Sequence, residues 1–178
     1  MAVLGKQEII RMINRGEILG AEELFLSPAS LDFRLGPHLL SLAVDHTINT
    51  KSFDDLPWEK HTIDEGSGFV LQPNVLYLGS TVEELNLPAN VAVRADGKST
   101  IGRLGLMVHV TAGFVDPGFK GSITLEMISN NPIIVHRGMR IGQFTFQSVS
   151  GESREVYKGR YQSRQNGLPC PPKGGGIY

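Results

Sequence analysis

Apolar residues in this chain recur in short runs separated by glycine, proline, asparagine and aspartate. Such runs, apolar or alternating and bounded by turn residues, are typical of β-strands. The predicted strands are Ser30–Leu35, His38–Leu42, Gly68–Leu71, Val75–Ser80, Ala89–Arg94, Leu106–Val110, Ser122–Ile128, Ile133–His136 and Ile141–Gln147. The chain's 21 glycines and 10 prolines supply the turns between them. The pattern therefore predicts a mainly all-β sandwich or barrel with little helix.

Three segments depart from this pattern. Residues 5–15 predict a short amphipathic helix, because three isoleucines share one face and Gly16 can end it. Thr50–Glu65 is polar and has no clear period, so we interpret it as a surface excursion. Residues 1–156 are expected to form the β domain. Residues 157–178 end in a proline- and glycine-rich stretch, which predicts a tail that is mobile unless a ligand or a neighbouring subunit orders it.

Composition narrows the class of protein. The 178 residues suffice for one domain with a sizeable core, and the net charge of -1 gives no footprint for nucleic acid or an anionic membrane. No apolar run is long enough to span a membrane, and the first residues are too polar for a secretory signal. The single cysteine, Cys170, rules out an internal disulfide and a zinc site built from several cysteines of one chain. We therefore expect a reducing, cytoplasmic location.

The run from Ala95 to Met127 concentrates the candidate chemistry. Its first loop, Gly97–Arg103, offers hydroxyls, backbone N–H groups and two cations, which together suit a phosphate cradle without a helix. Its second loop, Thr111–Gly121, carries one acid among apolar residues. The strand that follows carries Glu126 between apolar and β-branched neighbours, a setting in which a carboxylate is a candidate functional group.

Several motifs together resemble the dCTP deaminase branch of the trimeric dUTPase-like superfamily. They are SLDFRLG at Ser30–Gly36, ELNLP at Glu84–Pro88, GKSTIGRLGL at Gly97–Leu106, HVTAGFVDPGFKG at His109–Gly121, TLE at Thr124–Glu126, GMRIGQ at Gly138–Gln143, and RY with a following QNG at Arg160–Gly167. The resemblance implies a distorted jelly-roll of antiparallel strands. It also implies a homotrimer with three active sites at the subunit interfaces.

Deamination of cytosine needs a water for attack at C4 and a proton for the departing ammonia. Most nucleobase deaminases use zinc for the first task, and this chain lacks the cysteines for it. A partly desolvated glutamate is suited to such proton transfer, and Glu126 matches the family's general acid/base. The alternative is that Glu126 is a structural strand residue paired with Arg103.

The first loop supplies further candidates through the resemblance. Ser99 is assigned to phosphate and the catalytic water, and Arg103 to the neighbourhood of the base and Glu126, where a fixed cation stabilises developing charge. Lys98 and Thr100 occupy positions where the family usually has arginine and serine. Lysine keeps the charge but loses the planar fork, so a phosphate contact is expected of Lys98. The alternative for Lys98 is a solvated loop cation.

The second loop contributes Ala112 through its backbone carbonyl, with His109 and Thr111 lining the approach. Thr124 of the TLE motif is assigned to the nucleotide. A lone histidine in an apolar run is also commonly a hydrogen-bonded core residue, and both interpretations of His109 stay open.

Asp116 decides between one reaction and two. Its surroundings resemble the dUTPase motif in which an aspartate orients a water toward the α-phosphate and binds the 3′-hydroxyl. Gly113 stands where bifunctional members have glycine, which admits close backbone approach and leaves room for a second water. The alternative is a turn glycine, with Asp116 capping the Pro117-Gly118 turn. Asp32 matches a structural acid of the superfamily.

The resemblance also assigns Tyr157, Arg160 and Gln165 to a segment that closes over the nucleotide. Gln143 is assigned to the triphosphate. A triphosphate substrate implies Mg²⁺, which we expect to be held mainly by phosphates and water, with no protein ligand.

The prediction is therefore a bifunctional dCTP deaminase and dUTP diphosphatase that forms dUMP and is inhibited by dTTP. Three alternatives stay open: a deaminase that releases dUTP, a plain dUTPase, and a non-catalytic trimer that senses dTTP or dUTP.

Overall fold

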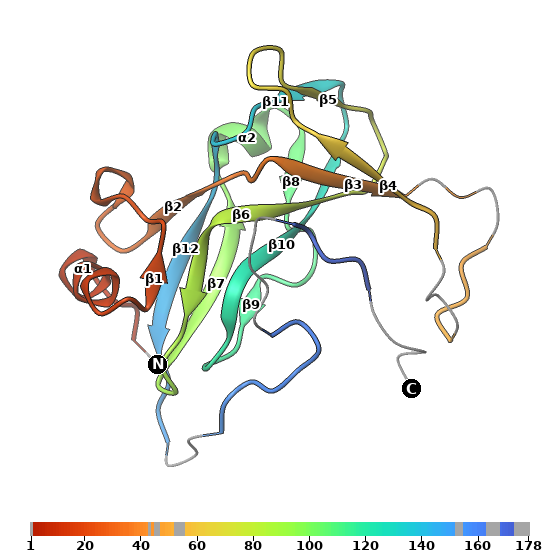
Figure 1. Cartoon of the computed structure of the whole chain (residues 1–178). Coiled ribbons are helices and arrows are strands. Elements are labelled where there is room, and N and C mark those ends of the chain that lie inside the picture. Colours follow the sequence, from red (N-terminus) through yellow and green to blue (C-terminus); the bar gives the residue numbers. More distant parts are fainter. Residues whose placement is uncertain are drawn as a thin grey trace.

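Two long strands form the middle of the larger sheet (Figure 1). The computed structural model describes residues 2–42, 44, 47–51, 56–151, 155–162 and 168–172. Within them, β6 (Tyr77–Asn86) and β10 (Lys120–Ser129) pair antiparallel. The sheet order is β4 (Trp58–Thr62), β3 (His38–Leu42), β6, β10 and β8 (Leu106–Val108), and β1 (Ile18–Leu19) also pairs with β6.

The second sheet has the order β2 (Leu31–Arg34), β12 (Arg140–Ser148), β7 (Val91–Gly97) and β9 (Phe114–Val115). A small pair, β5 (Phe69–Leu71) with β11 (Ile133–Val135), completes the strands of the described residues. Each of these pairings is antiparallel, as expected for a jelly-roll. The prediction of a mainly all-β fold is confirmed.

The core lies between the two main sheets and is rich in aromatic rings. Phe33, Phe144 and Phe146 are fully buried, with ring centroids 4.6 Å apart for the first two and 6.3 Å for the last two. Tilted and edge-on aromatic contacts of this kind stabilise a core beyond the area they bury. Gly142 on β12 makes the packing possible, because a Cβ there would lie 2.0 Å from Cζ of Phe33.

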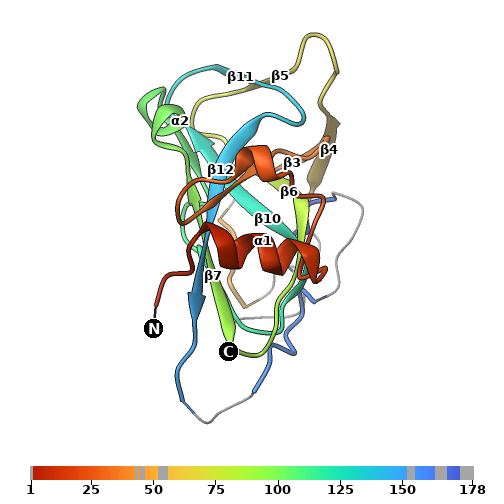
Figure 2. The same cartoon turned by 90° about the vertical axis from the view of Figure 1, so that its left-hand side faces the viewer.

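Helix is short and peripheral. The predicted first helix is confirmed as α1 (Lys6–Asn14), which buries Ile9 and Met12 and lies on the outer side of the sheets (Figure 2). The 3-10 turn η1 (Glu23–Phe25) follows β1. No helix of the described residues is long and apolar enough to cross a membrane.

Two expectations were wrong. The excursion Thr50–Glu65 contains strand β4, which pairs over five residues with β3. It is an edge strand whose residues are mostly exposed, so its sequence lacks the alternation of a half-buried strand. The loop Gly97–Arg103 contains helix α2 (Ser99–Arg103), which rests Ile101 against the core. Gly105, with φ of +91°, follows the helix end in the conformation that glycine favours.

Candidate active site

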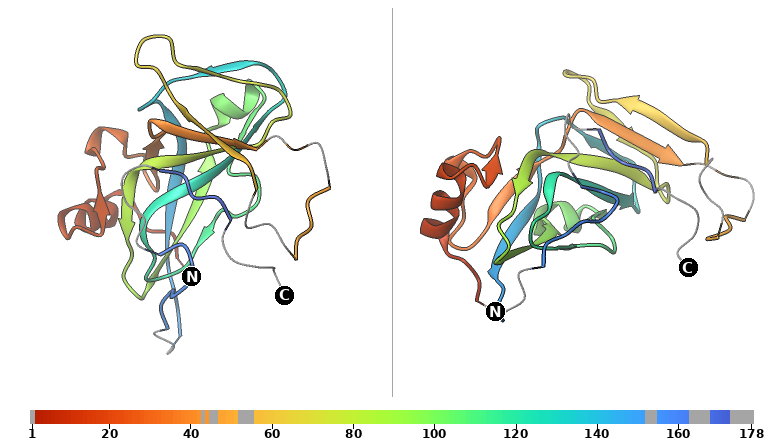
Figure 3. Two further views of the ribbon diagram at one scale, coloured as in Figure 1. Left: turned by 45° about the vertical axis from the view of Figure 1, so that its right-hand side comes forward. Right: turned by 60° about the horizontal axis from the view of Figure 1, so that its bottom comes forward.

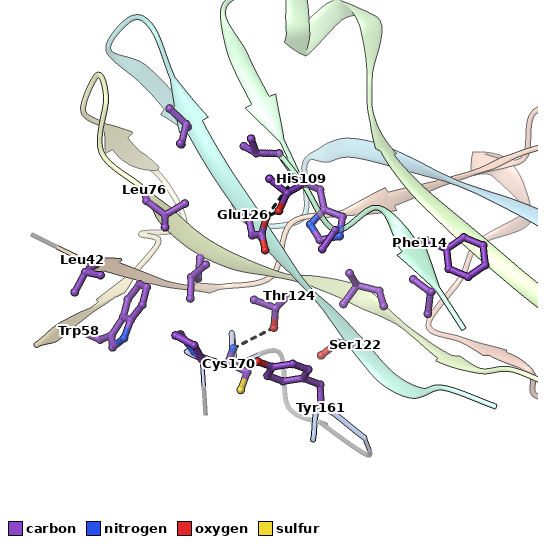
Figure 4. Close-up of a pocket in the computed structure, with 18 of the residues that line it drawn as sticks. Leu42, Trp58, Leu76, His109, Phe114, Ser122, Thr124, Glu126, Tyr161 and Cys170 are labelled. Atoms are coloured by element: carbon purple, nitrogen blue, oxygen red, sulfur yellow. Dashed lines mark hydrogen bonds between the residues drawn. The ribbon is translucent and has the colours of Figure 1, made fainter. Parts of the chain in front are cut away.

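A cavity of about 680 Å³ opens beside β10, between the edge formed by β3 and β4 and the loop that joins β8 to β9 (Figure 4). The described part of the tail lines it as well, and Figure 3 shows this segment returning along the sheet in blue. Five predicted nucleotide-binding residues line the cavity: Ala112, Asp116, Thr124, Glu126 and Tyr157. The cavity is therefore lined by about half of the residues predicted to bind the nucleotide.

The alternation of β10 aims its functional side chains into this cavity. Leu125 and Met127 are fully buried in the core, whereas Thr124 and Glu126 are half-buried and line the cavity. Successive side chains of a strand point to opposite faces, so the apolar residues of β10 anchor the strand and the polar ones face the cavity.

Glu126 is oriented by Thr111, which lies in the loop after β8. The Thr111 hydroxyl donates a hydrogen bond of 2.7 Å to Oε2 of Glu126, and the Thr111 backbone N–H donates one of 3.3 Å to the same oxygen. Oε1 accepts no hydrogen bond from the described residues, and it is available to a water in the cavity. Arg103 makes no ion pair with Glu126 within the described chain, so the structural alternative for Glu126 is not supported.

His109 lines the cavity next to Glu126 in a strained conformation. Its φ of +63° is uncommon for a residue other than glycine. Its Nδ1 is buried and has no hydrogen-bond partner among the described residues, and both interpretations of His109 stay open. Burial lowers the pKa of His109, and the Glu126 carboxylate opposes this shift only in part. The ring is therefore neutral at neutral pH.

Asp116 faces the cavity from the tight turn that precedes β10. The side chain is exposed, and the Asp116 carbonyl accepts the Phe119 N–H at 3.2 Å, which closes the turn. Gly113 does approach a backbone closely, as predicted, but the partner is β7. Its carbonyl accepts the Ala95 N–H at 2.8 Å, and a Cβ on Gly113 would lie 3.0 Å from the Ala95 oxygen. Gly113 is not among the described residues that line the cavity.

The first part of the tail is tied to the same turn. The Tyr157 N–H donates to the Pro117 carbonyl at 2.8 Å, and its ring lies 5.8 Å from that of Phe119. Gln162, which was not predicted, accepts the Lys120 N–H at 2.9 Å and donates to the Gly118 carbonyl at 2.9 Å. Arg160 does not line the cavity, and Gln165 lies outside the described residues.

A second part of the tail, residues 168–172, enters the cavity. The Cys170 backbone N–H donates to Oγ1 of Thr124 at 3.1 Å, and Cys170 and Pro172 both line the cavity. Trp58, on the unpredicted strand β4, lines the cavity too (Figure 4). Sequence reasoning missed Trp58 and Cys170, because neither belongs to a recognised motif.

The other half of the predicted site lies elsewhere. Residues Lys98, Ser99, Thr100, Arg103 and Gln143 are absent from the described lining of the cavity. They gather where α2 follows β7 and where β12 pairs with β2, and Gln143 lies opposite Asp32 in that pairing. Lys98 is not a freely solvated cation, because its Nζ lies 2.5 Å from Oδ2 of Asp32.

Comparisons with known proteins identify the family of this chain. The sequence model of the dCTP deaminase-like family matches residues 3–149, and the chain belongs to that family. A protein of Dictyoglomus thermophilum described as dCTP deaminase, dUMP-forming, is 34% identical over 178 residues, which cover 95% of this chain and 92% of the relative. A protein of Corynebacterium glutamicum with the same description is 36% identical, over 96% of this chain and 95% of the relative.

The fold also has a solved counterpart. The crystal structure of 2′-deoxycytidine 5′-triphosphate deaminase from Agrobacterium tumefaciens superposes with a TM-score of 0.66 at 24% sequence identity. The match covers 81% of this chain and 47% of that chain. This likeness supports the mainly β fold expected from the sequence.

Proposed function

We propose that this chain is a bifunctional dCTP deaminase and dUTP diphosphatase, which converts dCTP and two waters into dUMP, ammonia and diphosphate. The observation that carries the proposal is a cavity holding two carboxylates with separate surroundings. Glu126 is held by Thr111 with one oxygen open, and Asp116 lies exposed in a turn. The descriptions of the relatives as dUMP-forming deaminases support the same reaction.

In the deamination, Glu126 acts as the general acid and base. Its open Oε1 takes a proton from a water whose oxygen attacks C4 of the cytosine ring, and that proton passes to N3. The second water proton then passes through the same carboxylate to the amino group. The C4–N bond breaks, ammonia departs and the uracil carbonyl remains. Because Oε2 accepts the hydrogen bond from Thr111, Oε1 is the oxygen that accepts and donates the protons in this step.

In the second step Asp116 orients a water toward the α-phosphorus of dUTP. The new P–O bond forms as the bond to the β-phosphate breaks, and diphosphate departs. Positioning and electrostatic stabilisation supply most of the catalysis of phosphoryl transfer, so one well-placed carboxylate has a large effect.

The complete site is proposed to lie between subunits of a homotrimer. The hydroxyls and cations of Lys98–Arg103 lie outside the cavity of their own chain, and a second chain could bring them to it. Exposed apolar side chains support contact surfaces at both parts: Leu104 and Met107 follow α2, and Val110 and Phe114 line the cavity. Oligomer interfaces are enriched in such apolar surface.

Mg²⁺ is proposed to arrive on the triphosphate, whose charge it neutralises. An ion carried by phosphates and water needs no dedicated group of protein ligands. We also propose that dTTP competes for the cavity, because contacts to ribose and triphosphate do not read the base. The cytoplasm, where dCTP is available, is the proposed location.

A direct test mixes the protein with dCTP and Mg²⁺ and separates dUTP from dUMP by chromatography. We expect dUMP and ammonia in equal amounts, with added dUTP also consumed. Accumulation of dUTP, with added dUTP left intact, would instead identify a deaminase that stops after the first step.

A further inference from the structure

We infer that Asp32 is a positioning residue, which holds the Lys98 ammonium and the Arg140 guanidinium as a two-cation clamp for the triphosphate. The inference rests on the proposed function. Lys98 Nζ lies 2.5 Å and Arg140 Nη1 lies 3.4 Å from the same oxygen, Oδ2 of Asp32. Asp32 lies on β2, Arg140 begins β12, and Lys98 directly follows β7.

Burial makes Asp32 the fixed member of this cluster. Its side chain is 5% exposed, whereas those of Lys98 and Arg140 are 29% and 52% exposed. The carboxylate is therefore anchored inside the protein, while the remaining N–H donors of both cations reach the surface. A charged donor on a flexible stem loses less entropy on binding an anion when a partner already fixes its position.

The net charge of the cluster favours binding of an anion. Two cations share one carboxylate, so the cluster keeps a positive charge that a polyphosphate can neutralise. The Phe25 ring adds a further support, because the Arg140 guanidinium lies 5.4 Å from its centroid. Arg140 is thus held on two sides, although it belongs to none of the predicted site residues.

The cluster also fixes the start of the loop that carries Ser99. The Lys98 backbone N–H donates to the Ile141 carbonyl at 3.2 Å, and helix α2 begins at the next residue. Lys98 is thereby held through its backbone by β12 and through its side chain by β2. Ser99, assigned to phosphate, follows it directly in the chain.

Asp32 is poorly arranged for a purely structural role. Its Oδ1 is buried and has no hydrogen-bond partner among the described residues. Leaving a buried carboxylate oxygen unpaired costs folding free energy. The unpaired Oδ1 therefore lowers the stability of the fold. In return, Oδ2 holds both cations close together, as binding of an anion by a pair of cations requires.

The test measures binding of inorganic tripolyphosphate by calorimetry, together with KM and kcat for dCTP. For Asp32→Asn we expect tripolyphosphate affinity to fall by about tenfold or more, the size expected when one charged hydrogen bond is misplaced. KM should rise by a similar factor and kcat should change less. Asp64→Asn is the matched control, because Asp64 accepts hydrogen bonds from Gly66 and Ser67 in an exposed turn and an asparagine can do the same.

Other outcomes decide against the inference. Unchanged tripolyphosphate affinity with a lowered melting temperature would show that Asp32 is only structural. Tighter binding would show that Asp32 merely neutralises the two cations. If Asp32→Asn does not fold, Lys98→Gln and Arg140→Gln provide the measurement, and unchanged affinity in both would overturn the clamp. Tripolyphosphate binding needs no turnover, so a wild-type protein that fails to convert dCTP would refute the proposed function separately.

Discussion

The Thr111 hydroxyl donates a 2.7 Å hydrogen bond to one carboxylate oxygen of Glu126, and the Thr111 backbone donates to the same oxygen. This pairing fixes the rotation of the carboxylate, because one of its two oxygens is held and the other is left for the substrate water. Thr111 lies in a loop and Glu126 on a strand, so the loop conformation controls the orientation of the proposed catalytic group.

Replacement of Thr111 by valine tests this relationship. Valine keeps the shape but removes the hydroxyl, and the freed carboxylate can rotate. We expect kcat for ammonia release to fall by about tenfold, as for the loss of one hydrogen bond to a charged group. Thr62→Val is the control, because Thr62 contacts only His38 through its hydroxyl among the described residues. Equal rates for Thr111→Val and wild type would remove Thr111 from the mechanism.

Glu126→Gln should abolish deamination and leave nucleotide binding intact. The amide has the same size as the carboxylate but cannot shuttle protons. General acid–base catalysis by one group contributes roughly 10²–10⁴-fold, and the loss should be at least of this order. Ammonia release and equilibrium binding of dCTP should be measured side by side. Near-normal ammonia release by Glu126→Gln would contradict the role of Glu126 as the general acid and base.

Asp116→Asn should separate the two reactions. If Asp116 orients only the water at the α-phosphorus, the variant deaminates dCTP and accumulates dUTP. Hydrolysis of added dUTP should slow by orders of magnitude, because positioning supplies most of this catalysis. Asp116 is also assigned to the 3′-hydroxyl, so KM for dCTP should rise. A variant that still forms dUMP at the wild-type rate would contradict the role.

Two inactive variants should restore activity when mixed, if the site joins two chains. Arg103→Ala keeps an intact cavity, and Glu126→Gln keeps an intact α2. After denaturation and joint refolding in equal amounts, about a quarter of the interfaces would join two intact halves, by random assortment in a cyclic trimer. We expect about that fraction of wild-type activity. A mixture that stays inactive, while wild type survives the same refolding, would argue for a site within one chain.

His109 should make the protein less stable below neutral pH. Burial lowers its pKa from the ordinary value of 6.5, so the folded chain binds a proton less readily than the unfolded chain. The stabilising contribution is complete above pH 6.5 and is lost as the pH falls toward the lowered value. Denaturant unfolding at pH 7.5 and pH 5.5 measures it. His109→Asn, which tolerates positive φ, should show a smaller loss than wild type.

His38 provides the matched comparison for this measurement. Its pKa is also lowered, by burial and by the Lys60 charge, but the residue lies on β3, outside the cavity lining of the described chain. His38→Asn should therefore leave the contribution of His109 in place. An identical pH dependence in wild type and His109→Asn would show that His109 does not titrate as inferred.

The sequence predicted the parts of the fold that carry their own pattern. Each predicted strand run contains a strand, because alternation and turn residues are local signals. Strand β4 was missed, since an edge strand with mostly exposed residues leaves no such signal. Helix α2 was missed because it is only five residues long and lies in a glycine-rich segment. Its position depends on the packing of Ile101 against the core, which the sequence does not show.

The candidate site was predictable where one strand carries it. Thr124 and Glu126 share a face of β10 by simple alternation. The bond from Thr111 to Glu126 lies two residues beyond the left-handed backbone of His109, and sequence reveals neither feature. The contact of Lys98 with Asp32 joins residues 66 positions apart and depends on the registers of β2 and β7 with β12.

The Thr124 hydroxyl is already engaged before any nucleotide arrives, because the backbone of Cys170 donates to it. A nucleotide that binds in this cavity as proposed therefore meets residues 168–172 already in place there. Where the nucleotide displaces residues 168–172 from the cavity, its measured affinity includes the work of that displacement. Under the proposed function, nucleotide and tail compete for one cavity, so the substrate is held less tightly than its contacts alone would give, and the product is released more easily.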